Sequence, residues 1–256
     1  MSQELNDVNE NSRLKKYENL LIKRDTVKKE AINYEREYMR VFGDLILKVF
    51  KHKIEAIKLK KQISFCLRYV NRGQEIEKES LNRYIEGEMA KYYGQLDSMM
   101  EQNESVKKDT ALSEYDFLSI KKIYRRMVKL IHPDINNLTE KNEELSDLWD
   151  RLLSAYTCNN LKSMEEVEVL IYSALERIGD DNIKPVIEDI DEKIADVERE
   201  IYEITNTDPY MYKKLLGDKE AVEFKKEELQ RELEELVEHI KFQKSMYEDI
   251  KKRGGM

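Results

Sequence analysis

Hydrophobic side chains recur every three or four residues along most of the 256-residue chain, a spacing that places them on one face of an α-helix. The steps by four and three are most regular at Ile190, Ile194, Val197 and Ile201, where they are typical of a coiled coil. Eight glycines and three prolines leave few positions for tight turns. We therefore predict an all-α protein with long helical arms of the coiled-coil type.

Breaks in this pattern divide the chain into segments. The first twelve residues are polar and have little to bury, so we expect them to be disordered. Gly73 is a plausible end for the first long helix, and residues 102–110 lack an apolar period and resemble a linker. We predict, in order, a disordered tail, a basic helical arm, a second helical segment, a core of shorter helices and an acidic helical hairpin, at residues 1–12, 13–72, 74–103, 110–178 and 183–253.

The two long arms carry opposite charge. Residues 13–72 contain 17 Lys and Arg against 7 Asp and Glu, net +10, whereas residues 185–252 contain 12 against 20, net −8. Such charges could steer the arms together within one chain, or between two chains as a homodimer. Both arms could equally be solvated helix faces, because an exposed ion pair contributes less than ~1 kcal/mol. The sequence leaves these alternatives open.

The region around residues 120–134 combines an apolar helix face with a strongly basic one. No acidic residue lies between Ser119 and Ile131, and the polar face carries five cations, Lys121, Lys122, Arg125, Arg126 and Lys129. Pro133 disfavours a helical conformation at His132 and has no backbone donor, so we expect the helix to end there. His132 and Asp134 would then lie on a rigid turn. This arrangement is typical of a docking surface for a protein.

These residues resemble helix II and the HPD loop of J domains, the DnaJ family of co-chaperones. The resemblance runs without a gap through the five cations, Tyr124 and the tripeptide His132-Pro133-Asp134, and it continues downstream at Trp149, Leu152, Ala155 and Tyr156. It covers residues 110–178, about a quarter of the chain.

The chain also departs from the family's pattern. The family's first-helix signature, a tyrosine followed by Leu-Gly, is missing before residue 120. Either residues 92–100 or the N-terminal arm could supply that helix. There is no linker rich in glycine and phenylalanine and no zinc module. The resemblance therefore implies a reduced J protein, with a J-domain-like helical hairpin flanked by long arms.

The resemblance implies docking on a DnaK-type chaperone ATPase. Lys121, Lys122, Arg125, Arg126 and Lys129 would steer and hold that partner, and the tripeptide His132, Pro133 and Asp134 would favour ATP hydrolysis. The chain would contribute no catalytic residue, cofactor or metal site, since the nucleotide belongs to the partner. Its arms would bind a client, set its location or mediate self-association. The alternative is a coiled-coil scaffold in which the J-like fold survives without activity.

Composition argues against several other classes of protein. The net charge of −8 disfavours a nucleic-acid binder. No apolar run approaches the ~20 residues that span a membrane, and the N-terminus lacks the apolar core of a signal peptide, so we expect a cytoplasmic protein. Cys66 and Cys158 form no metal-binding or disulfide pattern, and we expect both in the core. An enzyme using His132 and Asp134 as an acid-base pair has no further motif to support it.

Overall fold

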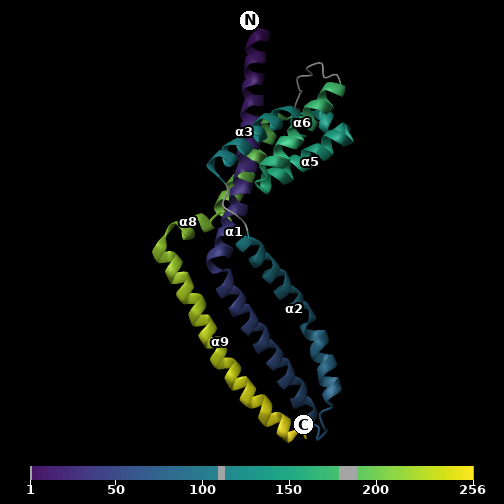
Figure 1. Cartoon of the computed structure of the whole chain (residues 1–256), viewed down its shortest axis with the longest axis vertical. Helices are drawn as coiled ribbons and strands as arrows, with labels where there is room; N and C mark the ends of the chain where they lie inside the picture. Colours follow the sequence, from purple (N-terminus) through teal and green to yellow (C-terminus); the bar gives the residue numbers. More distant parts are fainter. Residues whose placement is uncertain (1, 109–112, 179–188, 256) are drawn as a thin grey trace. The chain divides into compact units, whose positions relative to one another are not determined.

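The computed structural model describes the backbone of residues 2–108, 113–178 and 189–255. Within these ranges the structure contains helices and no strands, so the prediction of an all-α protein is confirmed. The helices are α1 (Ser2–Val70), α2 (Lys78–Lys108), α3 (Glu114–Ile131), α4 (Asn137–Lys141), α5 (Glu143–Thr157), α6 (Leu161–Ile178), α7 (Ile190–Asn206), α8 (Tyr212–Gly217) and α9 (Lys219–Arg253). Figure 1 labels all of these except α4 and α7.

The chain folds into two compact units. Unit 1 contains residues 1–34 and 110–211, and unit 2 contains residues 35–109 and 212–256. Helix α1 contributes its first part to unit 1 and its second part to unit 2. Each unit has its own apolar core, so we describe them separately.

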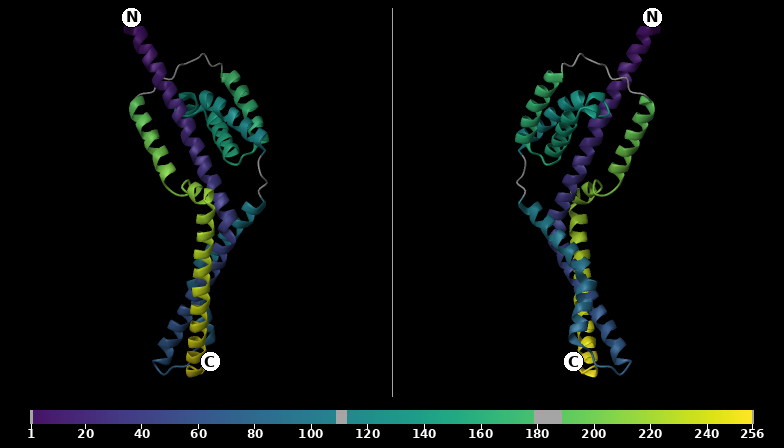
Figure 2. Two further views of the ribbon diagram at one scale, coloured as in Figure 1. Left: turned by 90° about the vertical axis from the view of Figure 1, so that its left-hand side faces the viewer. Right: turned by 90° about the vertical axis from the view of Figure 1, so that its right-hand side faces the viewer.

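In unit 1 the first part of α1 lies between α7 and the group formed by α3, α5 and α6 (Figure 2). Side chains from all five helices form one buried core, to which α1 contributes Tyr17, Leu21, Ile22 and Val27. Local caps set the helix starts. Asn142 accepts a hydrogen bond from the amide of Leu145 at the start of α5, and Asn160 accepts one from Ser163 at the start of α6.

In unit 2, α2 and α9 lie on either side of the second part of α1 (Figure 1). Phe42 and Val49 of α1 pack against Leu229 of α9, while a second cluster joins α1, α2 and the end of α9. Gly73 closes the turn after α1 with a φ of +65°, a conformation that glycine adopts without steric cost. The first helix therefore ends where the sequence predicts.

Opposite charges pair α1 with both C-terminal helices inside one chain. In unit 1, Lys16 pairs with Glu198 of α7 at 2.9 Å and Lys28 pairs with Glu200 at 2.5 Å. In unit 2, Lys53 of α1 pairs with Glu232 of α9 at 2.6 Å. Within each unit, the opposite charges of the arms therefore pair along α1. Pairing of the arms between two chains as a homodimer stays a prediction.

The structure differs from three details of the predicted organisation. Residues 2–12 are helical as the start of α1, because the segment contains no proline or glycine and extends a helix already formed by packing. Helix α2 likewise continues to Lys108, through most of the expected linker. The C-terminal segment 183–253 is not one hairpin, because α7 belongs to unit 1 and α9 to unit 2. Residues 110–112 and 183–188 of the predicted segments lie outside the described residues.

The two cysteines differ from each other, although the sequence places both in the core. Cys66 is buried in unit 2, whereas Cys158 is exposed because it follows the last turn of α5. None of the helices in the described ranges is both long enough and apolar enough to cross a membrane.

The close approach of α1 and α2 at Gly43 gives a test of this packing. A β-carbon at Gly43 would overlap the amide oxygen of the buried Asn103 and lie 3.1 Å from its Cγ, while Asn103 Nδ2 donates to Asp44 at 2.9 Å. We expect Gly43→Ala to lower the free energy of unfolding by about 1 kcal/mol, although alanine is the better helix former. Urea unfolding measures this change.

Gly87 of α2 is the matched control, because nothing lies within 4 Å of its β-carbon position. Gly87→Ala should raise the free energy of unfolding by about 0.5–1 kcal/mol. In an Asn103→Ala background, Gly43→Ala should also become stabilising, because the space it needs is then open. An equal gain from Gly43→Ala and Gly87→Ala in the native background would contradict the close packing.

Candidate partner-binding site

The tripeptide lies on a turn that closes α3. His132 has an extended conformation, with φ −63° and ψ 127°, while its amide still donates to the carbonyl of Val128 at 3.1 Å. The amides of Ile135 and Asn136 both donate to the carbonyl of His132, at 2.9 and 2.8 Å. Asn136 Nδ2 donates to the carbonyl of Leu130 at 2.7 Å. These bonds fix the turn, so α3 ends where the sequence predicts.

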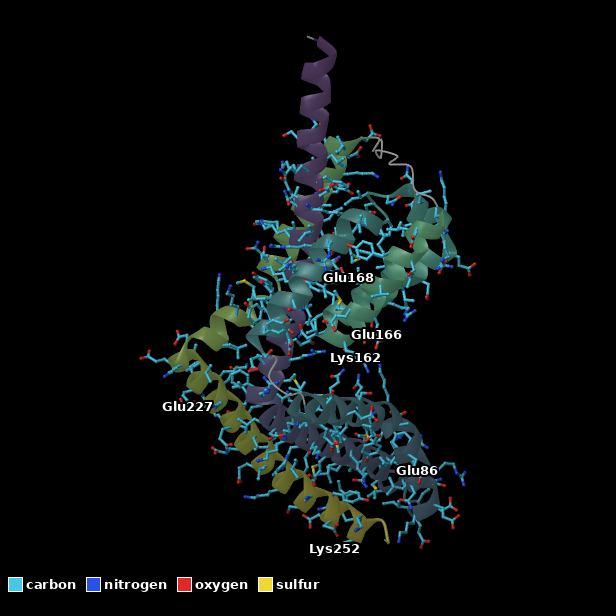
Figure 3. The ribbon with its side chains drawn as sticks, turned by 45° about the horizontal axis from the view of Figure 1, so that its top comes forward. Glu86, Lys162, Glu166, Glu168, Glu227 and Lys252 are labelled. Carbon is cyan, nitrogen blue, oxygen red and sulfur yellow. The ribbon has the colours of Figure 1, made fainter. Side chains whose placement is uncertain are left out.

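The cationic side of α3 remains largely open to solvent. Lys122, Arg125, Arg126 and Lys129 are exposed, and Lys121 is half-buried. Arg126 pairs with Glu168 of α6, with 2.7 Å between Nε and Oε1; Figure 3 shows where Glu168 lies on α6. No ion pair in the described part of the chain engages Lys122, Arg125 or Lys129. We call the surface formed by these five cations the α3 basic face.

His132 is buried, although the sequence predicts that the turn carrying it belongs to a docking surface. Its side chain is 3% exposed, and its ring meets the edge of Trp149 from α5 with 4.6 Å between centroids. Nδ1 lies 3.1 Å from the amide of Asp134, and Nε2 lies 3.4 Å from Nη2 of Arg24. A neutral imidazole has one accepting nitrogen, so only one of these two contacts can be a hydrogen bond at a time.

Burial keeps the His132 imidazole neutral. It lowers the pKa of His132 to about 4, and the Arg24 guanidinium acts in the same direction, while the carboxylates of Asp134 and Asp25 oppose the shift. Asp134 itself is 41% exposed and Pro133 is partly exposed. Pro133 and Asp134 are therefore the members of the tripeptide that reach the solvent.

Arg24 of α1 connects the turn to two other helices. Its Nε donates to Oδ1 of Asp25 at 2.9 Å, and its Nη1 lies 3.8 Å from Oδ2 of Asp134 and 3.7 Å from Oε2 of Glu200 on α7. The sequence analysis missed this residue. The contact with His132 joins positions 108 residues apart, and no local pattern distinguishes Arg24 from the other cations of the N-terminal arm.

The N-terminal arm packs directly on the hairpin of α3 and α5. Tyr124 of α3 donates a 2.6 Å hydrogen bond to Oδ2 of the buried Asp25, and its ring stacks on Tyr156 of α5 at 3.8 Å. Burial, reinforced by Asp25, raises the pKa of the Tyr124 hydroxyl, so it remains a donor. Of the two segments considered for the missing first helix, the N-terminal arm shares a core with α3 and α5, whereas residues 92–100 belong to unit 2.

Lys29 extends the same contact between α1 and α5. Its ammonium group lies 3.9 Å from the centroid of the Tyr156 ring, a cation-π geometry. Burial, together with the charge of Lys121, lowers the pKa of Lys29 to about 8. The cations of α1 and α3 therefore influence one another across this interface.

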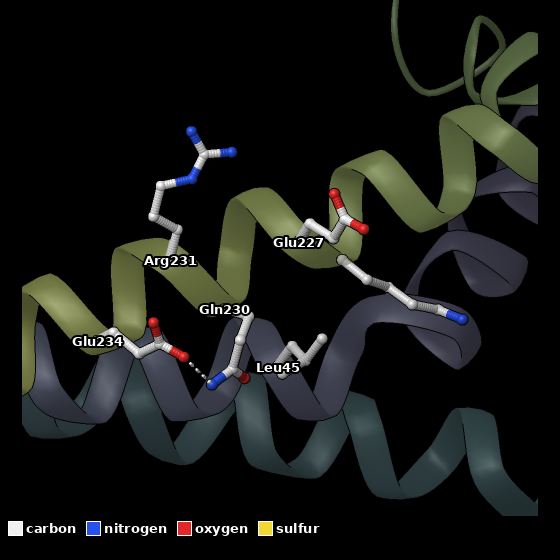
Figure 4. A pocket seen from close by; sticks show the side chains of 6 residues that line it. Leu45, Glu227, Gln230, Arg231 and Glu234 are labelled. Atoms are coloured by element: carbon white, nitrogen blue, oxygen red, sulfur yellow. Dashed lines mark hydrogen bonds between the residues drawn. The ribbon is translucent and has the colours of Figure 1, made fainter.

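Other parts of the described structure offer weaker sites. No group of three or more His, Cys, Asp or Glu side chains in the described ranges has the arrangement of a metal site. A groove in unit 2 is lined by Leu45, Lys226, Glu227, Gln230, Arg231 and Glu234 (Figure 4). The groove carries charges of both signs, and two of its lining residues bond to each other, with Gln230 donating a hydrogen bond to Glu234 at 3.0 Å. The turn after α3 and the α3 basic face form the best-defined candidate.

Comparisons of this chain with protein-family models, with curated protein sequences and with solved structures found no match.

The burial of His132 predicts a pH-dependent stability. The pKa of His132 is about 4 in the folded chain and about 6.5 in a solvated histidine. Between these values the unfolded chain binds a proton that the folded chain does not. The contribution of neutral His132 to the free energy of unfolding is therefore fully present above pH 6.5 and is lost as the pH falls toward 4. The His132 contribution to this slope is at most about 1.4 kcal/mol per pH unit.

Urea unfolding between pH 7.5 and 5 measures this slope. His132→Gln should unfold with a shallower pH dependence, because it lacks the titrating ring. His239→Gln on the exposed side of α9 is the control and should keep the slope of the native chain. Identical slopes for His132→Gln and the native chain would show that His132 is not held neutral by burial.

Proposed function

We propose that this protein is a J-domain-type co-chaperone that docks on a DnaK-type chaperone ATPase and stimulates its ATP hydrolysis. The observation that carries the proposal is the geometry at the end of α3. A helix with four exposed cations ends at a hydrogen-bonded turn that presents Pro133 and Asp134 to solvent. The resemblance of these residues to the J-domain motif gives this surface its suggested partner.

Electrostatics would bring the partner to the site. Lys122, Arg125 and Lys129 have no ion pair within the described chain, so an acidic surface can approach them without displacing another group. Several such charges on one face raise the association rate and fix the orientation of the encounter. The turn would then contact the partner and shift its equilibrium toward the hydrolysing conformation. The chain itself makes and breaks no covalent bond in this proposal.

Unit 2 would have a role in the co-chaperone that is separate from docking on the ATPase. It contains no part of the α3 basic face, and its helices α2 and α9 carry their own exposed surfaces. We assign client binding, localisation or self-association to it, in the cytoplasm. These assignments follow from the proposed activity of unit 1.

A scaffold with an inactive J-like fold is the second candidate, and the burial of His132 favours it. A side chain that is 3% exposed cannot itself contact a partner unless the turn moves. The two candidates make different predictions for the native chain. A co-chaperone stimulates a DnaK-type ATPase, whereas the scaffold binds its partners without changing the rate of ATP hydrolysis.

The α3 basic face can be tested by charge reversal. Replacing Lys122, Arg125 and Lys129 with glutamate should weaken binding to a DnaK-type chaperone at least about tenfold at low salt, because each exposed pair contributes up to ~1 kcal/mol. The difference should shrink as the salt concentration rises. Isothermal titration calorimetry at two salt concentrations measures both effects.

A control with the same change in net charge replaces Lys219, Arg231 and Lys252, which are exposed on α9. This variant should bind like the native chain. Equal weakening by both sets of substitutions would indicate a non-specific charge effect and would argue against docking through α3.

The turn can be tested separately from the helix. Asp134→Asn keeps the size of the side chain and removes its charge, and Asp134 is exposed enough for the variant to fold normally. We expect stimulation of ATP hydrolysis to fall at least about tenfold, as for loss of a charge-assisted contact. Asp150→Asn on the exposed face of α5 is the control and should stimulate like the native chain. Full stimulation by Asp134→Asn would exclude the proposed role of the turn.

A further inference from the structure

Arg24 contacts both polar members of the tripeptide from a different helix. Its Nη2 lies 3.4 Å from Nε2 of His132, and its Nη1 lies 3.8 Å from Oδ2 of Asp134. A guanidinium group can approach His132 and Asp134 at the same time because its N–H donors form a rigid planar fork. A lysine in the same place would offer a single ammonium group on a flexible stem and could not reach all of these partners at once.

The Arg24 guanidinium is itself held from two sides. Asp25 accepts a hydrogen bond from Nε of Arg24 at 2.9 Å. Asp25 also accepts one from the hydroxyl of Tyr124 at 2.6 Å, which fixes its carboxylate. Glu200 of α7 lies 3.7 Å from Nη1 and also pairs with Lys28 at 2.5 Å. The Arg24 side chain is 16% exposed, so it has little freedom to rotate into solvent. All of these groups belong to unit 1.

Tyr17 supports the same arrangement two turns earlier on α1. It is buried, and its hydroxyl feels the charge of Asp134, which adds to burial in raising the pKa of Tyr17 to about 12. The N-terminal part of α1 therefore lies along the tripeptide, and Arg24 is its charged contact with it.

We propose that Arg24 is a positioning residue for the docking turn: from α1 it fixes the carboxylate of Asp134 and the ring of His132, so that the partner meets one arrangement of the tripeptide. This inference rests on the proposed co-chaperone function and deepens it. The partner contacts Pro133 and Asp134, while His132 supports the turn from beneath.

An inhibitory role for Arg24 would change the stimulation of ATP hydrolysis in the opposite direction. If its guanidinium simply blocked Asp134, removing it would free the carboxylate and increase stimulation. A positioning role requires that stimulation decrease, because the turn loses its fixed geometry. The sign of the change separates the two roles.

The test uses the full-length protein with the substitutions Arg24→Met and Arg24→Lys. Single-turnover ATP hydrolysis by a DnaK-type chaperone is measured over a range of co-chaperone concentrations, which separates affinity from maximal stimulation. We expect Arg24→Met to lower maximal stimulation about tenfold with little change in affinity, and Arg24→Lys to restore part of it. Lys16→Met removes a cation of α1 that pairs with Glu198 and should leave both quantities unchanged.

A second readout does not depend on the partner. NMR titration of the His132 ring reports its pKa, which the Arg24 guanidinium helps to lower while Asp25 and Asp134 oppose it. Arg24→Met should therefore raise the pKa of His132 above about 4, by less than the full shift because burial is its largest cause, whereas Lys16→Met should leave it unchanged. A purely structural role for Arg24 elsewhere in α1 would not move this value.

The possible results distinguish the two proposals. If the native chain gives no stimulation, the co-chaperone function fails, and the His132 titration alone decides whether Arg24 controls the turn. If the native chain stimulates and Arg24→Met stimulates equally or more strongly, the positioning role is overturned. If circular dichroism shows that Arg24→Met does not fold, Arg24→Lys decides: native behaviour in both readouts overturns the inference, and a partial loss supports it.

Discussion

The arrangement of unit 1 depends on one buried carboxylate, Asp25. Its side chain is 6% exposed, and burying a charge is costly unless it is paired and hydrogen-bonded. Tyr124 and Arg24 provide these partners, one from α3 and one from the adjacent position on α1. Because the Tyr124 bond forms only when α1 lies on α3 in one register, the cost of an unpaired Asp25 selects that register over others.

The same interaction links the helix core to the candidate site. Tyr124 stacks on Tyr156 of α5, and Trp149, two turns earlier on the same face of α5, closes over His132. On the other side, the pairing of Asp25 with Arg24 directs the guanidinium toward the tripeptide and toward Glu200. The turn after α3 is therefore held by residues from α1, α5 and α7. Its geometry reflects the packing of unit 1 as much as the rigidity of Pro133.

The features that sequence reasoning could predict are those with local causes. The end of α3 follows from Pro133 alone, and the cationic face of α3 follows from the spacing of its lysines and arginines. Burial of His132 could not be predicted, because Trp149 and Arg24 cover it from distant parts of the chain. The division of the C-terminal segment between two units was missed for a similar reason. Its apolar stripes show that α7 and α9 are buried, but not which helix buries each of them.

The packing of α1 on α3 and α5 also determines how this chain can be divided. The motif suggests a self-contained segment beginning near residue 110, yet Tyr17, Leu21, Ile22 and Val27 complete the apolar core of that segment. A recombinant fragment cut at the motif's borders would leave the matching faces of α3 and α5 in contact with water. Exposed apolar surface of this kind promotes aggregation, so useful domain boundaries here follow the three-dimensional core and include two separate stretches of sequence.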